Sequence, residues 1–135
     1  MLHSLYSTFI LELLNIENSF QPITDVNTHS TDLFLRFLKL VNEHFISHHD
    51  LNYYADALAV TTIYLSRVVK RLSNQTIKNH IDRLLTMEAC FRLTNSDTPI
   101  AEIAEDLHFA NPASFCKFFS RQKGVPPREY RNKFQ

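Results

Sequence analysis

Turn-forming residues are scarce in this sequence, which has one glycine and five prolines among its 135 residues. Tight hairpins depend on glycine at positive φ, so this scarcity argues against an all-β fold. No apolar run reaches about 18 residues, so an ordinary membrane-spanning helix is not expected. No positively charged segment precedes the apolar residues 1–16, and no small-residue cleavage site follows them, so a signal peptide is not expected either.

Cysteine is also rare, and neither Cys90 nor Cys116 belongs to a CxxC motif. Lone cysteines in a chain without an export signal are typical of reduced, cytoplasmic proteins. A redox switch at Cys116 is not favoured, because the sequence offers no visible resolving thiol.

Clusters that could support metal binding or catalysis are missing as well. The His-His-Asp run at 48–50 has the right side chains for a metal, but adjacent residues of an extended chain point in opposite directions, and no matching cluster follows. His44, His80 and His108 lie on different expected elements, and the sequence pairs none of them with a serine, cysteine or carboxylate in a catalytic arrangement. Neither a metal site nor a cofactor is expected, and the chain is not expected to be an enzyme.

The formal net charge is zero, but the charges are unevenly distributed. Residues 61–83 hold five basic residues against one acidic residue, and residues 115–135 hold six against one. Between them, residues 84–114 hold one basic residue against five acidic ones, and residues 1–31 have three acidic residues and no lysine or arginine. Two positive zones separated by a negative one suit two phosphate-contacting regions, although such blocks are more often solvated surfaces.

Apolar residues make up 44% of the chain and include eleven phenylalanines, which is enough for a hydrophobic core. Their spacing of three and four predicts an all-α fold. The longest regular stretch runs from 76 to about 94 and contains neither glycine nor proline. It predicts a helix of about 28 Å that separates two similar helix pairs.

The first pair is predicted from residues 51–74. A short helix over 51–58 leads through a turn at Ala59-Val60 to a second helix capped by Thr61. Ala55 is expected where the two helices cross closely, and Asn74 is expected to end the second helix in left-handed geometry. The residues expected to face inward from the second helix are Leu65, Val68, Val69 and Leu72.

The second pair repeats this pattern about 49 residues later. Pro99 suits the first turn of a short helix, Ala104 takes the crossing position, and His108-Phe109 forms the turn. Asn111-Pro112 then predicts the start of the next helix, and Gly124, the only glycine, predicts its end. Phe115, Phe118 and Phe119 are spaced as core residues of this helix rather than as a base-stacking platform, and Pro126-Pro127 starts a last short helix.

The N-terminal part has two expected segments. Residues 1–17 read as a very apolar helix, which packs either on its own domain or on a partner. Residues 18–30 are polar, contain a proline and read as a linker. A helix with Thr31 or Asp32 as its N-cap is expected to follow.

The sequences IAEIAEDLHFANPASFCKFFSRQKGVPPREYR (Ile100–Arg131) and YADALAVTTIYLSRVVK (Tyr54–Lys70) resemble the DNA-binding domain of the AraC/XylS family of bacterial transcription regulators. The resemblance covers about residues 33–132. It implies two helix-turn-helix subdomains of about seven helices in all, an activator or repressor, and a second helix of each pair set into successive major grooves. The sequence departs from the family at Ala59 and His108, where glycine is frequent, and at Leu85 and Arg92.

The same resemblance divides the chain into two regions. Residues 31–135 would form the double helix-turn-helix domain. Residues 1–30 would be a helix and linker from a sensor and dimerisation domain whose remainder, including the effector site, is not in this chain. Double-stranded DNA is the implied partner, with RNA polymerase and a homodimer through residues 1–17 as further ones.

The resemblance also implies roles for individual residues. In the first recognition helix, about 62–72, those that would read bases are Ile63, Ser66 and Arg67, and those that would contact the backbone are Thr61, Thr62 and Lys70. In the second recognition helix, about 112–122, the residues that would read bases are Ala113, Cys116 and Lys117. The residues that would lie near phosphates are Asn111, Ser114 and Arg121. Arg67 is the strongest candidate, because a guanidinium pairs bidentately with guanine O6 and N7. The alternative function is a helical protein-interaction module that does not bind DNA.

Overall fold

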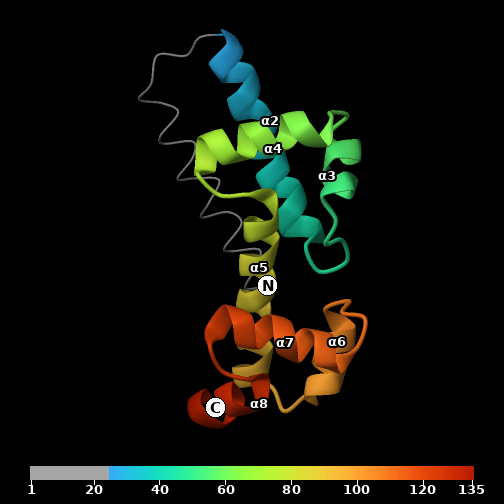
Figure 1. The fold of residues 1–135 in the computed structure, drawn as a ribbon, viewed down its shortest axis with the longest axis vertical. Helices are drawn as coiled ribbons and strands as arrows, with labels where there is room; N and C mark the ends of the chain where they lie inside the picture. Colours follow the sequence, from blue (N-terminus) through green and yellow to red (C-terminus); the bar gives the residue numbers. More distant parts are fainter. Residues whose placement is uncertain (1–24) are drawn as a thin grey trace. The chain divides into compact units, whose positions relative to one another are not determined.

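The computed structural model describes residues 25–135, and side chains from residue 28 onward. This part of the chain contains helices and no strand, which confirms the all-α prediction (Figure 1). The helices are α2 (Asp25–His44), α3 (Leu51–Ala57), α4 (Thr62–Ser73), α5 (Ile77–Asn95), α6 (Ile100–Asp106), α7 (Pro112–Lys123) and α8 (Pro127–Phe134). None of these helices is long and apolar enough to span a membrane. The helix expected over residues 1–17 lies outside the described residues.

The first helix of the described chain starts earlier than the sequence indicates. Residues 25–30 belong to α2, so their prediction as linker is wrong, and Thr31 and Asp32 lie inside the helix rather than capping it. A tertiary contact accounts for the difference. Ser30 is buried, and its hydroxyl accepts a hydrogen bond of 2.7 Å from the Arg71 guanidinium. This contact from a distant part of the chain stabilises a helical turn whose residues have little helix propensity of their own.

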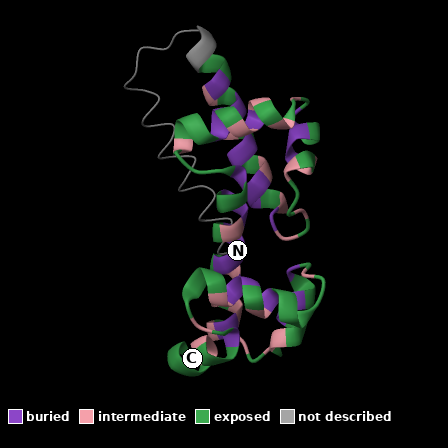
Figure 2. Cartoon of the chain, viewed as in Figure 1, coloured by how far each residue is buried: buried purple, intermediate pink, exposed green. Residues whose placement is uncertain are grey.

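The chain folds as two compact units, which divide between Ile81 and Asp82 within α5. In the first unit α2 packs against α3 and α4, and α3 packs against α4. The side chains between them are buried, and Figure 2 colours the ribbon at these residues purple. They include five apolar residues of α2 and the phenylalanine that follows it, namely Leu33, Phe34, Phe37, Leu38, Val41 and Phe45.

Two polar side chains are built into this first core. The buried ring of His80 lies edge-on to Phe37, with centroids 5.8 Å apart, and its Nε2 lies 3.0 Å from the Ser73 hydroxyl. The Tyr54 hydroxyl donates a 2.6 Å hydrogen bond to the carbonyl of His48, and burial raises the pKa of Tyr54. Both contacts tie a helix to the chain segment next to it.

In the second unit α7 packs against α6 and α8. Arg131 of α8 donates to the carbonyls of Leu93 and Ser96, at 3.0 and 3.2 Å, and so caps the C-terminal end of α5. Arg92 joins α5 to α6 through an ion pair with Asp106 at 3.5 Å, and a second ion pair within α5, with Glu88 at 2.9 Å, holds its side chain. These two arginines therefore serve the fold of the unit.

Tyr130 completes the second core from α8. Its ring lies 5.4 Å from that of Phe119 and 4.6 Å from that of Phe134. A hydrogen bond with Cys90, followed by burial and electrostatic interaction with Cys90, raises the pKa of Tyr130 to about 12. Cys90 is thus a partner of the core tyrosine.

Candidate nucleic-acid interface

The turn between α3 and α4 is a Schellman motif centred on Ala59. The Val60 amide donates to the Ala55 carbonyl at 3.0 Å, and the Ala59 amide donates to the Asp56 carbonyl at 3.1 Å. This bond pattern ends a helix when the residue after its cap is left-handed, and Ala59 has φ 57°. Ala55, predicted at the crossing, is buried and also supplies the acceptor carbonyl of the turn.

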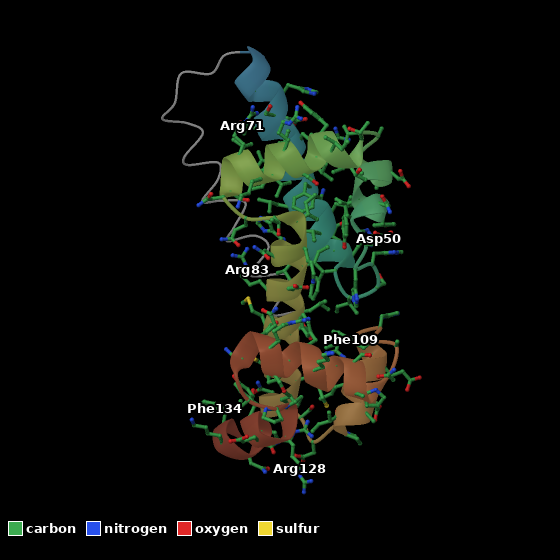
Figure 3. All side chains as sticks on the ribbon, viewed as in Figure 1. Asp50, Arg71, Arg83, Phe109, Arg128 and Phe134 are labelled. Atoms are coloured by element: carbon green, nitrogen blue, oxygen red, sulfur yellow. The ribbon has the colours of Figure 1, made fainter. Side chains whose placement is uncertain are left out.

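The turn after α6 repeats this geometry. The Phe109 amide donates to the Ala104 carbonyl at 3.0 Å, and the His108 amide donates to the Glu105 carbonyl at 3.0 Å. His108 has φ 63°, and Ala104 is buried. Phe109, labelled in Figure 3, then packs its ring 5.2 Å from those of Phe115 and Phe118. Both helix pairs are therefore built on one design, as the sequence repeat predicts.

The second helix of each pair begins at a side-chain cap, as predicted. The Thr61 hydroxyl accepts from the Tyr64 amide at 3.1 Å, and the Asn111 side-chain oxygen accepts from the Ser114 amide at 2.7 Å. Each helix also ends in a left-handed residue, Asn74 with φ 59° or Gly124 with φ 80°. The expected ranges of about 62–72 and 112–122 are confirmed within a residue by α4 and α7.

The outward face of α4 carries the residues singled out in the sequence. Ile63 is 71% exposed, Arg67 and Lys70 are exposed, and Ser66 is half-buried. Thr62, the first residue of the helix, is half-buried. The opposite face holds the buried Leu65, Val68 and Val69.

Leu72 does not belong to that buried face. It was expected to point inward, but it is 41% exposed, so that prediction is wrong. It lies in the last turn of α4, and apolar spacing alone does not show how far the side chains of that turn are covered.

The outward face of α7 has a different chemistry. Ala113, Ser114 and Lys117 are exposed, and Cys116 is half-buried, while Phe115, Phe118 and Phe119 fill the core as predicted. The face therefore presents one cation, two hydroxyl or thiol groups and one methyl. Arg121 is exposed further along the helix, beside the next turn.

The structure also separates the basic residues that the charge pattern groups together. Arg71 binds Ser30 of α2, and Arg131 caps α5, so both guanidiniums have partners within their own unit. The Lys123 ammonium lies 5.8 Å from the centre of the Tyr130 ring, a cation–π contact. Arg128 extends from α8 and is exposed (Figure 3). The Ser30 contact could not be found from sequence, since its partners are 41 residues apart and nothing in the pattern pairs them.

The residues of the His-His-Asp run have structural contacts. Asp50 caps α3 by accepting from the Asn52 amide at 3.2 Å, and the His48 ring stacks on that of Tyr53 at 3.7 Å. His49 Nε2 lies 3.0 Å from the Ile46 carbonyl oxygen. No group of three or more potential metal-binding side chains is present within residues 28–135.

Comparison with known proteins agrees with this architecture. Residues 54–133 match a family model described as a helix-turn-helix domain. The chain is 26% identical over 93 residues to the regulatory protein SoxS of Escherichia coli strain K12, which covers 69% of this chain and 87% of SoxS. It is 33% identical over 69 residues to the uncharacterised HTH-type transcriptional regulator YobQ of Bacillus subtilis strain 168, which covers 51% of this chain and 29% of YobQ.

Two solved structures share the fold. The C-terminal domain of AraT, a response regulator from Geobacillus stearothermophilus, has a TM-score of 0.70 at 28% identity, covering 75% of this chain and 84% of that domain. The DNA-binding domain of AdpA, solved in complex with a target DNA, has a TM-score of 0.69 at 21% identity, covering 75% of this chain and 91% of that one. The chain therefore belongs to the AraC/XylS family of helix-turn-helix transcription regulators, and residues 54–133 lie in its sequence-specific DNA-binding domain.

Proposed function

We propose that α4 and α7 are the two recognition helices of this domain and that they enter successive major grooves of one duplex. The observation that carries the proposal is the repeated geometry of the two helix pairs. In each, a Schellman turn and a capped N-terminus fix a helix with one apolar face in the core and one polar face outward. An α-helix fits the major groove of B-DNA, where every base pair presents a distinct pattern of groups.

On α4, Ile63, Ser66 and Arg67 would read bases, because they share the exposed face of the helix. Thr61, Thr62 and Lys70 would contact the DNA backbone from the start and the far end of that face. The Thr61 side-chain oxygen already caps the helix, so its hydroxyl proton is the group available to a phosphate. Backbone contacts of this kind position a protein on DNA without selecting a sequence.

On α7, Ala113, Cys116 and Lys117 would face the bases. Asn111, Ser114 and Arg121 would lie near phosphates. Since Ala113 and Cys116 form few hydrogen bonds, this helix would depend more on DNA shape and on thymine methyl groups than α4 does. Lys117 would supply its main charged contact.

The partners beyond DNA belong to the same proposal. Contact with RNA polymerase would be part of the work of such a regulator. Residues 1–17 would contribute to a homodimer, the part of residues 1–30 that precedes α2 would belong to the sensor and dimerisation domain, and the effector would bind in the rest of that domain. The protein would work in the cytoplasm.

Selection from a pool of random duplexes tests the proposal. Enrichment of one motif is expected, followed by binding that weakens steeply with salt, because phosphate contacts release counterions. The variant Lys70→Ala should weaken binding to all sequences alike and flatten the salt slope by about one unit. Lys39→Ala, which removes an exposed lysine of α2, is the matched control and should leave the slope unchanged.

Two results would contradict the proposal. Recovery of no enriched motif, with weak binding that is equal for all duplexes, would favour a helical protein-interaction module. Enrichment with an unchanged salt slope in Lys70→Ala would remove Lys70 from the DNA-contacting residues.

A further inference from the structure

One large apolar side chain lies on the otherwise polar outward face of α4. Ile63 is 71% exposed, whereas the apolar residues of the other face, Leu65, Val68 and Val69, are at most 1% exposed. Ile63 follows the cap residue Thr61 by two positions, at the N-terminal end of the helix. The Ile63 side chain is therefore not part of the hydrophobic core of its unit.

The neighbours of Ile63 on this face are suited to DNA. Ser66, Arg67 and Lys70 follow it by three, four and seven residues, which places all four side chains on one side of an α-helix. Arg67 and Lys70 are exposed cations, so this face suits an anionic ligand such as DNA. The apolar side chain of Ile63 would then contact an apolar group of the DNA.

The second helix pair provides an internal comparison. The same register on α7, fifty residues later, holds Ala113, Cys116 and Lys117 where α4 holds Ile63, Ser66 and Arg67. The side chain at the first of these positions is a single methyl group in α7 and a branched four-carbon group in α4. An apolar contact from this register is therefore much larger for α4.

Thymine is the base that offers such a contact in the major groove, through its C5 methyl group. We propose that Ile63 packs against a thymine methyl and thereby makes a thymine part of the sequence that α4 reads. Ile63 and Arg67 are four residues apart, about 6 Å along the helix. This corresponds to one or two base-pair steps of about 3.4 Å, so the thymine lies within about two base pairs of the guanine contacted by Arg67.

This inference depends on the proposed function, and methyl deletion separates the two. A duplex enriched from the random pool is prepared with each thymine replaced in turn by deoxyuridine, which lacks only the methyl group. One replacement should weaken binding about fourfold, the value expected for one buried methyl or methylene group. The other replacements should change the affinity little.

A double-mutant cycle then assigns the effect to Ile63. In Ile63→Ala, deoxyuridine at that position should no longer weaken binding, whereas Ile63→Val should keep most of the difference. The side chain is exposed, so both variants should fold. Leu72→Ala is the matched control, because Leu72 is also an exposed apolar residue of α4 but lies nine residues on, about half a turn around the helix. It should keep the full fourfold effect.

Each contrary result has a distinct meaning. Sequence-specific binding with no sensitivity to any deoxyuridine would overturn the thymine contact and leave the proposed function intact. If deoxyuridine still weakens the binding of Ile63→Ala, another residue contacts the thymine methyl, and the proposed role of Ile63 is overturned. Absence of any enriched duplex would reject the proposed function, and the inference with it.

Discussion

Arg71, in the last turn of α4, donates a hydrogen bond of 2.7 Å to the hydroxyl of the buried Ser30 on α2. The contact joins the C-terminal end of α4, where Figure 3 labels Arg71, to the first turns of α2. It also withdraws one guanidinium of the basic zone at 61–83 from the outward face. The two helices are thereby fixed to each other at a point that sequence spacing does not indicate.

Removing this contact should destabilise the protein. Ser30→Ala deletes the acceptor. A hydrogen bond to a charged group contributes roughly 1.5–3 kcal/mol, and the contribution is smaller here because Arg71 is exposed. Urea unfolding should show a loss of about 1 kcal/mol, with more fraying of the first turns of α2 in hydrogen exchange. Ser47→Ala, at an exposed serine, is the control. Equal stability of Ser30→Ala and the wild type would contradict a structural role for the bond.

The two left-handed turn residues predict an unusual gain in stability. Ala59 and His108 have φ of 57° and 63°, a conformation that costs non-glycine residues about 1–2 kcal/mol. Glycine removes this cost but makes the unfolded chain more flexible, by about 0.4–1 kcal/mol. Ala59→Gly and His108→Gly should therefore each raise the free energy of unfolding by about 0.5–1 kcal/mol.

The reverse substitution is the matched test of the same physical cause. Gly124 has φ 80°, and a Cβ added there meets no atom within 4 Å, so the cost of Gly124→Ala is conformational. Thermal unfolding should show a loss of about 1 kcal/mol. A stabilising Gly124→Ala, or a destabilising Ala59→Gly, would show that these turns adopt another conformation.

Tyr54 should make the fold sensitive to alkaline pH. Burial, and secondarily the charge of Tyr53, raises the pKa of Tyr54 in the folded state, whereas tyrosine in the unfolded chain ionises near about 10. The contribution of the neutral phenol is therefore complete below about pH 10 and is lost as the pH rises toward the folded-state pKa. Stability measured by urea unfolding should fall steadily above about pH 10.

The variant Tyr54→Phe isolates this effect. It should lose about 1 kcal/mol near pH 8, since the 2.6 Å bond to the His48 carbonyl is missing. Its stability should then fall less steeply above pH 10 than that of the wild type. Tyr64→Phe, at a half-buried tyrosine of α4, controls for loss of a tyrosine hydroxyl. Identical slopes for Tyr54→Phe and the wild type would remove Tyr54 as the cause.

Arg67 should contribute to recognition in a sequence-dependent way. Arg67→Ala is expected to weaken binding to the enriched duplex by roughly 1–3 kcal/mol and to relax selection at one base pair. Stability should change little, because the side chain is exposed. Arg36→Ala, at an exposed arginine of α2, controls for the lost charge. A uniform loss of affinity for all duplexes would make Arg67 a phosphate contact.

Local signals in the sequence account for most of the fold. Thr61 and Asn111 as N-caps, Asn74 and Gly124 as left-handed ends, and the apolar spacing of α4, α5 and α7 each predict a boundary within about one residue. These features depend on residues close together in the chain. Local sequence is therefore sufficient to predict them.

The failures share a different physical origin. Residues 25–30 are helical, with Ser30 held by Arg71, and Leu72 is 41% exposed although its spacing matches that of the buried residues of α4. Both facts depend on contacts between distant segments. For the interface, the spacing of Ile63, Ser66 and Arg67 predicts which side chains share a face, and their base-reading roles remain a prediction. The assignment of the residues before α2 to a preceding domain also remains a prediction.

The central claim is that α4 and α7 occupy neighbouring major grooves of one duplex, and hydroxyl-radical and methylation-protection footprinting on the enriched duplex test it most directly. The expected result is two protected major-groove segments with centres about 10 base pairs, or about 34 Å, apart. Arg67→Ala should weaken protection in one segment and Lys117→Ala in the other. A single protected segment, or loss of the same segment in both variants, would contradict the account.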